Sequence, residues 1–231
     1  MTCDLETTEP TGPVYRLGRR GLVWAWPDWA YAGEDGTFGN RYDDPHGQYR
    51  VLYASSQRLG TFLETLARFR PDPAILAEPI TEDPADELYP TTAPGVIPAD
   101  WLTRRAMGTA TVVGGFADVG HSRSLEHLRT RLAARLIHYG FEDLDAATIR
   151  MSAPRRFTQE ISRHVYECSH PDGERAYAGI RYASRLGDEV YNWAICEPAD
   201  LVDTQEGELS DEDPDLGQAL ARFGLRRTGD K

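Results

Sequence analysis

The feature that most restricts the fold is a proline-rich stretch near the middle of the chain. Residues 71–98 hold seven of the fifteen prolines, at positions 71, 73, 79, 84, 90, 94 and 98. Proline disrupts helix interiors and central strands, so no long regular element can cross this stretch. We interpret it as a surface loop or a partly ordered insertion. A domain boundary is the alternative, but each flanking part contains too few expected strands to close a core alone.

Segments with strand and helix patterns follow one another irregularly on both sides of this stretch. Segments rich in aromatic and β-branched residues are expected to form strands at 14–17, 22–26, 50–54, 109–113, 176–183 and 190–196. Apolar residues at i, i+3, i+4 and i+7 predict helices at about 57–70, 124–139, 158–168 and 215–225. The regular alternation of a doubly wound sheet is missing. The pattern predicts the α+β class: a single domain with mixed β-sheets and flanking helices.

Charge is distributed unevenly along the chain. The net charge is −12, and nine acidic residues lie between Glu197 and Asp215, where there is no Lys or Arg. The rest of the chain therefore carries only −3. An acidic protein is poorly suited to bind a phosphate backbone over a broad surface, so no nucleic-acid partner is expected. The acidic segment at about 197–215 is either a solvated surface, a contact for a basic partner or a flap over a site.

Features of membrane and secreted proteins are missing from the sequence. No run approaches the roughly 18–20 apolar residues that a membrane span needs, and the acidic N-terminus does not resemble a signal peptide. Cys3, Cys168 and Cys196 are too few and too scattered to predict a disulfide framework, and their odd number leaves at least one thiol free. We expect a cytoplasmic protein with no membrane partner.

Motifs for common cofactors and metals are also missing. The sequence contains no GxGxxG opening a helix after a strand, no GxxxxGK[ST], no CxxC and no HExxH. Its six histidines never pair at i and i+4 on an expected helix. No metal is therefore expected.

An ordered set of polar residues stands out between positions 39 and 64. A glycine-bearing turn at 39–43 (Gly-Asn-Arg-Tyr-Asp) presents Arg41. A strand end at 51–56 (Val-Leu-Tyr-Ala-Ser-Ser) presents Tyr53, and the following helix presents Glu64. Each residue also has an ordinary explanation: a solvated loop arginine, a core tyrosine, and a water-facing glutamate opposite the apolar face of its helix. Pattern alone does not decide between the two interpretations.

The same set resembles the RES domain family, which is named for an arginine, a glutamate and a serine. The resemblance continues at 179–184 (Gly-Ile-Arg-Tyr-Ala-Ser), where Ser184 matches the family's serine, and at 192–195 (Asn-Trp-Ala-Ile). Residues 14–17 (Val-Tyr-Arg-Leu) resemble the family's opening strand, which carries its own arginine, here Arg16.

The resemblance covers roughly residues 14–200 of a single RES-like domain, 1–231. The proline-rich region at about 71–100 and the acidic segment at about 197–215 are interpreted as additions to it. Asn40 and Asp43 depart from the glycine and asparagine that are usual in the family's turn. These departures bear on the geometry of the loop more than on the catalytic residues.

The resemblance implies a fold similar to the ADP-ribosyltransferases and an enzyme that cleaves the nicotinamide–ribose bond of NAD+. The acceptor would be inorganic phosphate, as a co-substrate, or water. The resemblance further implies a bacterial toxin paired with an antitoxin protein. Two alternatives stay open: an ADP-ribosyltransferase that modifies a protein or another macromolecule, and a non-catalytic interaction module.

The resemblance also implies roles for five residues. Glu64, Arg41 and Ser184 are the expected catalytic residues, and Arg16, Arg41, Tyr53 and Ser184 are expected to contact NAD+. A carboxylate such as that of Glu64 stabilises an oxocarbenium-like sugar. An arginine fork suits a pyrophosphate, and an aromatic face suits the cationic nicotinamide ring. Ser184 would orient the carboxamide or a ribose hydroxyl, although an ordinary turn serine is the alternative. Nicotinamide leaves as a neutral molecule, so no general acid is required.

Overall fold

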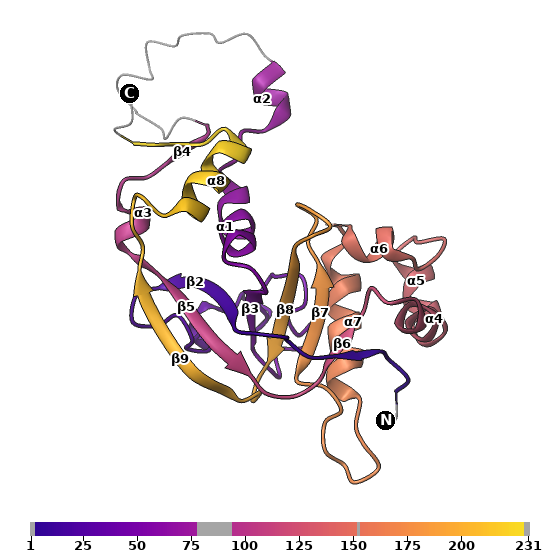
Figure 1. The fold of residues 1–231 in the computed structure, drawn as a ribbon. Coiled ribbons are helices and arrows are strands. Elements are labelled where there is room, and N and C mark those ends of the chain that lie inside the picture. Colours follow the sequence, from indigo (N-terminus) through magenta and orange to yellow (C-terminus); the bar gives the residue numbers. More distant parts are fainter. Residues whose placement is uncertain (1–2, 78–93, 152, 229–231) are drawn as a thin grey trace.

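A computed structural model describes residues 3–77, 94–151 and 153–228 of the chain. Among these residues, eight strands form one curled sheet (Figure 1). β6 runs parallel to β7, whereas the other neighbouring strands are antiparallel. In their order across the sheet, the strands are β1 (Thr7–Thr8), β6 (Phe116–Asp118), β7 (Gly179–Ala183), β8 (Tyr191–Cys196), β3 (Val51–Ser55), β2 (Val14–Arg19), β5 (Arg105–Val112) and β9 (Leu201–Glu208).

Helices lie against the sheet in two separate groups (Figure 1). α7 packs on β7 through an apolar stripe that includes Phe157, Ile161 and Val165, all of them buried. α4, α5 and α6 lie on the side of α7 that faces away from the sheet. α1 and α8 pack on each other near β2. The helices are α1 (Arg58–Leu66), α2 (Pro73–Ala77), α3 (Asp100–Thr103), α4 (Ser122–Arg131), α5 (Ala133–His138), α6 (Ala146–Arg150), α7 (Arg155–Glu167) and α8 (Pro214–Phe223). This architecture confirms the predicted α+β fold.

The sheet opens between β2 and β3. Among the described residues these two strands pair only at Tyr15 and Ser55, whereas β2 pairs with β5 along its whole length. Arg16 occupies the fork between them. Its Nε donates to the carbonyl of Val23 (2.9 Å) and its Nη1 to the carbonyl of Tyr53 (2.7 Å). These charge-assisted bonds supply donors to backbone carbonyls that lack a partner strand, because β2 and β3 have moved apart at this point.

The strand expected at 22–26 is absent, and that prediction is wrong. The chain reverses at Gly21, where φ is +76°, and then forms turns. Val23 is fully buried and lies so close to Gly18 of β2 that a Cβ at Gly18 would come within 2.8 Å of its Cα. The amides of Gly21 and Val23 donate to the carboxylate of Glu206. The side chain of Glu206 thus accepts the hydrogen bonds that a neighbouring strand would otherwise accept from these amides. The aromatic segment packs across β2 and does not join the sheet.

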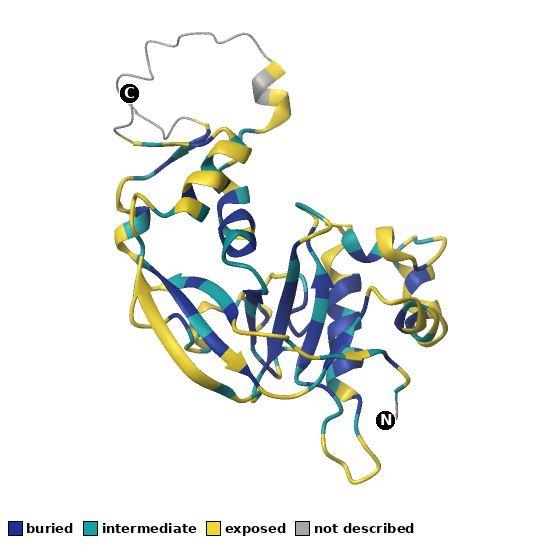
Figure 2. Ribbon diagram, in the orientation of Figure 1, coloured by how far each residue is buried: buried dark blue, intermediate teal, exposed yellow. Residues whose placement is uncertain are grey.

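The acidic segment is part of the fold. It contributes β9, an edge strand whose residues are almost all exposed, as Figure 2 shows in yellow. Without an apolar alternation, the sequence gives no signal for this strand. Four acidic residues of the segment 197–215 form ion pairs with arginines outside it: Arg50–Glu197, Arg20–Glu208, Arg227–Asp211 and Arg58–Asp213.

The predicted helices mostly form, with different boundaries. The helix expected at 124–139 divides into α4 and α5 at Leu132, whose backbone leaves the helical region. The helix expected at 57–70 becomes α1 followed by a short 3-10 helix, Ala67–Phe69. Most of the proline-rich region, 78–93, lies outside the described residues. The flanking β4 (Val96–Ile97) pairs in parallel with β10 (Arg226–Arg227).

The cysteine prediction also needs a correction. Cys3 and Cys168 form a disulfide with a Cα–Cα distance of 5.6 Å, although 165 residues separate them. β1 pairs with β6 at the sheet edge, which places the N-terminal segment near the end of α7. Cys196 is a free, buried thiol in β8.

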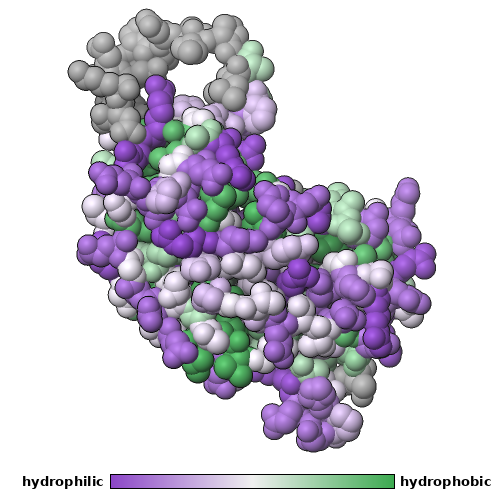
Figure 3. Space-filling model, in the orientation of Figure 1, coloured by the Kyte–Doolittle hydropathy of each residue, from purple (hydrophilic) through white to green (hydrophobic). Residues whose placement is uncertain are grey.

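Hydrophilic side chains cover most of the face shown in Figure 3, and hydrophobic ones appear between them in separate small groups. No helix within the described ranges combines the length and the apolar character that crossing a membrane requires.

Candidate active site

A pocket of about 600 Å³ lies at the fork between β2 and β3. A second, smaller pocket of about 220 Å³ lies at β4 and α3. β2, β3, the turn at 40–41, α1, the start of α7 and the ends of β7 and β8 all contribute to the wall of the larger pocket. The open fork and α1 therefore bring together segments that are far apart in the sequence.

The carboxylate of Glu64 is held on the wall of this pocket. Glu64 is exposed on α1, and its Oε1 accepts hydrogen bonds from Ser184 Oγ (2.6 Å) and Asn192 Nδ2 (2.7 Å). Its Oε2 accepts no hydrogen bond from the described residues and faces accessible space, because it is not among the buried unpartnered atoms. One oxygen fixes the orientation of the carboxylate, and the other stays available to a bound molecule.

Ser184 and Asn192 are buried supports beneath that carboxylate. Ser184 is 1% exposed, accepts from the amide of Leu186 (2.9 Å) and lies behind the lining of the pocket. Asn192, 2% exposed, does line the pocket, and its Oδ1 is buried without a partner. A buried polar atom without a partner is costly, so the hydrogen bond that Asn192 donates to Glu64 comes with an unsatisfied acceptor behind it.

Glycine at 179 helps to place these two supports. A Cβ on Gly179 would lie 2.0 Å from the carbonyl oxygen of Ala194 in β8, a distance that no side chain can adopt. The close approach keeps β7 and β8 in register, with Tyr182 opposite Asn192. Ser184 then follows directly after the end of β7.

The predicted arginines line the pocket but are already partly engaged. Arg16 bonds two backbone carbonyls at the fork, and burial lowers its pKa to about 10, so it remains charged at neutral pH. Arg41 donates from Nη2 to the carbonyl of Ile149, and its guanidinium lies 5.3 Å from the ring centres of Tyr42 and Tyr182. Its buried Nε has no partner.

Tyr53 fixes the turn that carries Arg41. Its hydroxyl donates to Asp43 Oδ1 (2.8 Å) and accepts from the amide of Tyr42 (2.9 Å). Asp43 Oδ2 in turn accepts from the amide of Asn40 (2.7 Å). Burial, together with the neighbouring Asp43, raises the pKa of Tyr53 well above its ordinary value, so the hydroxyl stays protonated. Burial also raises the pKa of Asp43. The ring of Tyr53 remains part of the pocket wall.

Further arginines line the pocket that sequence reasoning did not single out. Arg155, at the start of α7, donates to the carbonyl of Gly39 (2.6 Å). Arg68 and Arg185 are exposed, and neither has a hydrogen-bond or ion-pair partner among the described residues; Arg68 only stacks on Phe69. Signals for two of them exist in the sequence, because Arg68 lies one helical turn after Glu64 and Arg185 directly follows Ser184.

The split α+β sheet, with an oriented carboxylate and several arginines at the split, defines a candidate active site for an anionic substrate. The family model described as RES domain matches residues 13–215. The chain therefore belongs to the RES domain family, as the sequence motifs predict. None of the curated proteins gives a significant match. Among solved structures, the chain is similar to the M. tuberculosis MbcT–MbcA toxin–antitoxin complex, with 14% identity, a TM-score of 0.45 and 87% of each chain covered.

Proposed function

We propose that this protein cleaves NAD+ at the bond between nicotinamide and ribose. The observation that carries the proposal is the carboxylate of Glu64, which is held at Oε1 by two buried donors and presents Oε2 to the pocket. Cleavage of this bond develops positive charge on the ribose. A preoriented carboxylate stabilises that charge directly or through a ribose hydroxyl, without having to reorganise during the reaction.

The arginines supply the complementary site for the pyrophosphate. Arg68 and Arg185 have no ion-pair partner among the described residues, so their N–H groups are available for bidentate bonds to phosphate oxygens. Arg41 and Arg16 add positive charge to the same wall. The volume of about 600 Å³ falls within the ordinary range for a ligand of this size.

Aromatic rings are available for the bases. Tyr53 and Tyr182 both line the pocket and border the Arg41 turn. A tyrosine face attracts the cationic nicotinamide ring, and this attraction is lost when the ring becomes neutral on leaving. In the reaction the C1′–N bond breaks, and its electron pair moves to the nicotinamide nitrogen. A new bond then forms from C1′ to an oxygen of phosphate or of water, and water loses a proton.

From family membership we extend the proposal to the cellular role. The protein would act in the bacterial cytoplasm as a toxin that depletes NAD+ and that an antitoxin protein neutralises. Phosphorolysis is the preferred reaction, because a pocket with several arginines suits a second anion beside the dinucleotide.

The test is to incubate the purified protein with NAD+, with and without inorganic phosphate, and to follow nicotinamide and the ADP-ribose product. We expect nicotinamide release and, with phosphate, a phosphorylated ADP-ribose. Glu64→Gln should slow release about 10²–10³-fold, whereas Glu126→Gln, a matched exposed glutamate on α4, should leave it unchanged. No release by the wild-type protein would contradict the proposal. Label transferred to a macromolecule would favour an ADP-ribosyltransferase instead.

A further inference from the structure

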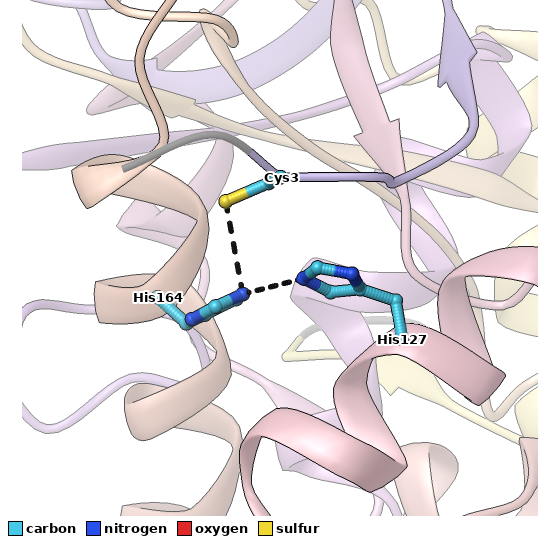
Figure 4. Close-up of side chains that lie close together, drawn as sticks. All are labelled: Cys3, His127 and His164. Carbon is cyan, nitrogen blue, oxygen red and sulfur yellow. Dashed lines mark hydrogen bonds between the residues drawn. The ribbon is translucent and has the colours of Figure 1, made fainter.

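A second cluster of chemically active side chains lies away from the pocket. It brings together Cys3 from the N-terminal segment, His127 from α4 and His164 from α7 (Figure 4). His164 Nε2 lies 3.1 Å from His127 Nε2 and 3.8 Å from Cys3 Sγ, and the three atoms all lie within 4.8 Å of one another. None of these residues lines the pocket.

The spacing of these atoms matches the edges of a tetrahedral metal site. Bond lengths of about 2.0–2.1 Å for Zn–N and 2.3 Å for Zn–S place two nitrogens about 3.3 Å apart, and a nitrogen and a sulfur about 3.6 Å apart. The observed 3.1 and 3.8 Å lie close to these values. Two imidazoles and a sulfur that point toward one common centre, as Figure 4 shows, are the ligands that zinc prefers.

A second cysteine is bonded to one member of this group. Cys168 directly follows α7, four residues after His164, and its sulfur is bonded to that of Cys3. Cys168 is fully buried, and His164 is 7% exposed. Once the disulfide is reduced, the thiolate of Cys168 completes a set of two cysteines and two histidines with the three grouped ligand atoms, which is the composition of a closed structural zinc site.

We propose that, when the Cys3–Cys168 disulfide is reduced, the two thiolates together with His127 and His164 bind one Zn²⁺, and that reoxidation releases it. On oxidation the thiolates pass two electrons to a disulfide or azo oxidant such as diamide. The S–S bond then forms, and zinc leaves as Zn²⁺. A reducing cytoplasm favours the thiol form, in which cysteine clusters more often bind metals than form disulfides. The proposal departs from the expectation of no metal.

The sequence patterns could not show this site, because its ligands come together only through the fold. The pairing of β1 with β6 carries Cys3 to the end of α7, and α4 packs near α7 through the same apolar cluster. Either form of the cluster, zinc or disulfide, fastens the N-terminal segment to these helices.

The test measures zinc in the full chain after reduction, incubation with Zn²⁺ and removal of free metal. We expect one equivalent of zinc per chain, loss of that zinc on oxidation with diamide, and a tetrahedral thiolate spectrum when Co²⁺ replaces zinc. His127→Gln and Cys168→Ser should lose the metal. His138→Gln, an exposed histidine on α5, should retain it.

Three results would overturn the proposal: no zinc in the reduced wild-type protein, unchanged zinc in both ligand variants, or zinc that survives disulfide formation. His127 is only half-buried, so its variant should keep the native circular dichroism spectrum even if Cys168→Ser does not fold. Nicotinamide release from NAD+ is a separate readout, so failure of this proposal and failure of the proposed function can be told apart.

Discussion

The pocket and the Cys–His cluster (Cys3, His127, His164 and Cys168) are two polar centres. They differ in whether their polar atoms are open to a bound molecule or are engaged with one another. In the pocket, buried Ser184 and Asn192 hold one oxygen of Glu64 and leave the other open. In the Cys–His cluster, the ligand atoms of Cys3, His127 and His164 lie together, and the sulfur of Cys168 is bonded to that of Cys3. A centre with an open position is suited to act on a substrate, whereas a closed centre is suited to stabilise the fold.

The largest expected effect separates the two centres directly. Glu64→Gln keeps the shape and the hydrogen-bonding capacity at Oε1 but removes the charge that stabilises the ribose cation. We expect kcat for nicotinamide release to fall about 10²–10³-fold with little change in KM. A glutamine variant with wild-type kcat would show that the open oxygen has no catalytic role.

Removing the two arginines that lack an ion-pair partner should have the next largest effect, on binding. In the Arg68→Ala/Arg185→Ala double variant, we expect KM for NAD+ to rise about 10²-fold, because two lost charge-assisted bonds at about 1.5 kcal/mol each cost about 3 kcal/mol. Arg226→Ala, an exposed arginine on β10, is the matched control and should leave KM unchanged. If the double variant and the control changed KM equally, Arg68 and Arg185 would not bind the pyrophosphate.

Ser184 tests whether the buried supports act through Glu64. Ser184→Ala removes one of the two donors to Oε1, and we expect kcat to fall about tenfold. Because Ser184 positions Glu64 and does not line the pocket, the same substitution should have no further effect in a Glu64→Gln background. Additive losses in a double-mutant cycle would instead give Ser184 its own contact with substrate.

The smallest effect on catalysis is expected at the Cys–His cluster. His127→Gln should leave kcat and KM for NAD+ unchanged while lowering the Tm of the reduced, zinc-loaded protein. The shift should be about 2–4 °C for each kcal/mol of stabilisation lost with the metal. Calorimetry with and without a chelator measures this difference. A fall in kcat on addition of the chelator would show that the Cys–His cluster contributes to catalysis and does not serve stability alone.

The sequence was a good guide to the pocket because its residues lie in ordered local motifs. The turn at 39–43, the strand end at 51–56 and the helix with Glu64 each follow from short-range patterns, and family resemblance supplies their order. Whether Glu64 faced water or a pocket could not be decided from the helix alone. That depends on the fork between β2 and β3, which no local pattern encodes.

What the sequence could not provide depends on contacts across long stretches of chain. β9 lacks an apolar alternation because only its edge position and polar contacts keep it in the sheet. The 22–26 segment has strand-like residues, yet a side chain, Glu206, satisfies its amides. Cys3 and Cys168 meet across 165 residues, a distance at which spacing carries no information.

In the proposed reaction, the open oxygen of Glu64 meets the ribose of NAD+. A crystal structure of Glu64→Gln with intact NAD+ tests it most directly, because the variant should bind the substrate without cleaving it. We predict the nicotinamide ribose within hydrogen-bond distance of the side-chain amide of residue 64, and the pyrophosphate against Arg68 and Arg185. NAD+ bound elsewhere, or a ribose out of reach of residue 64, would contradict the account.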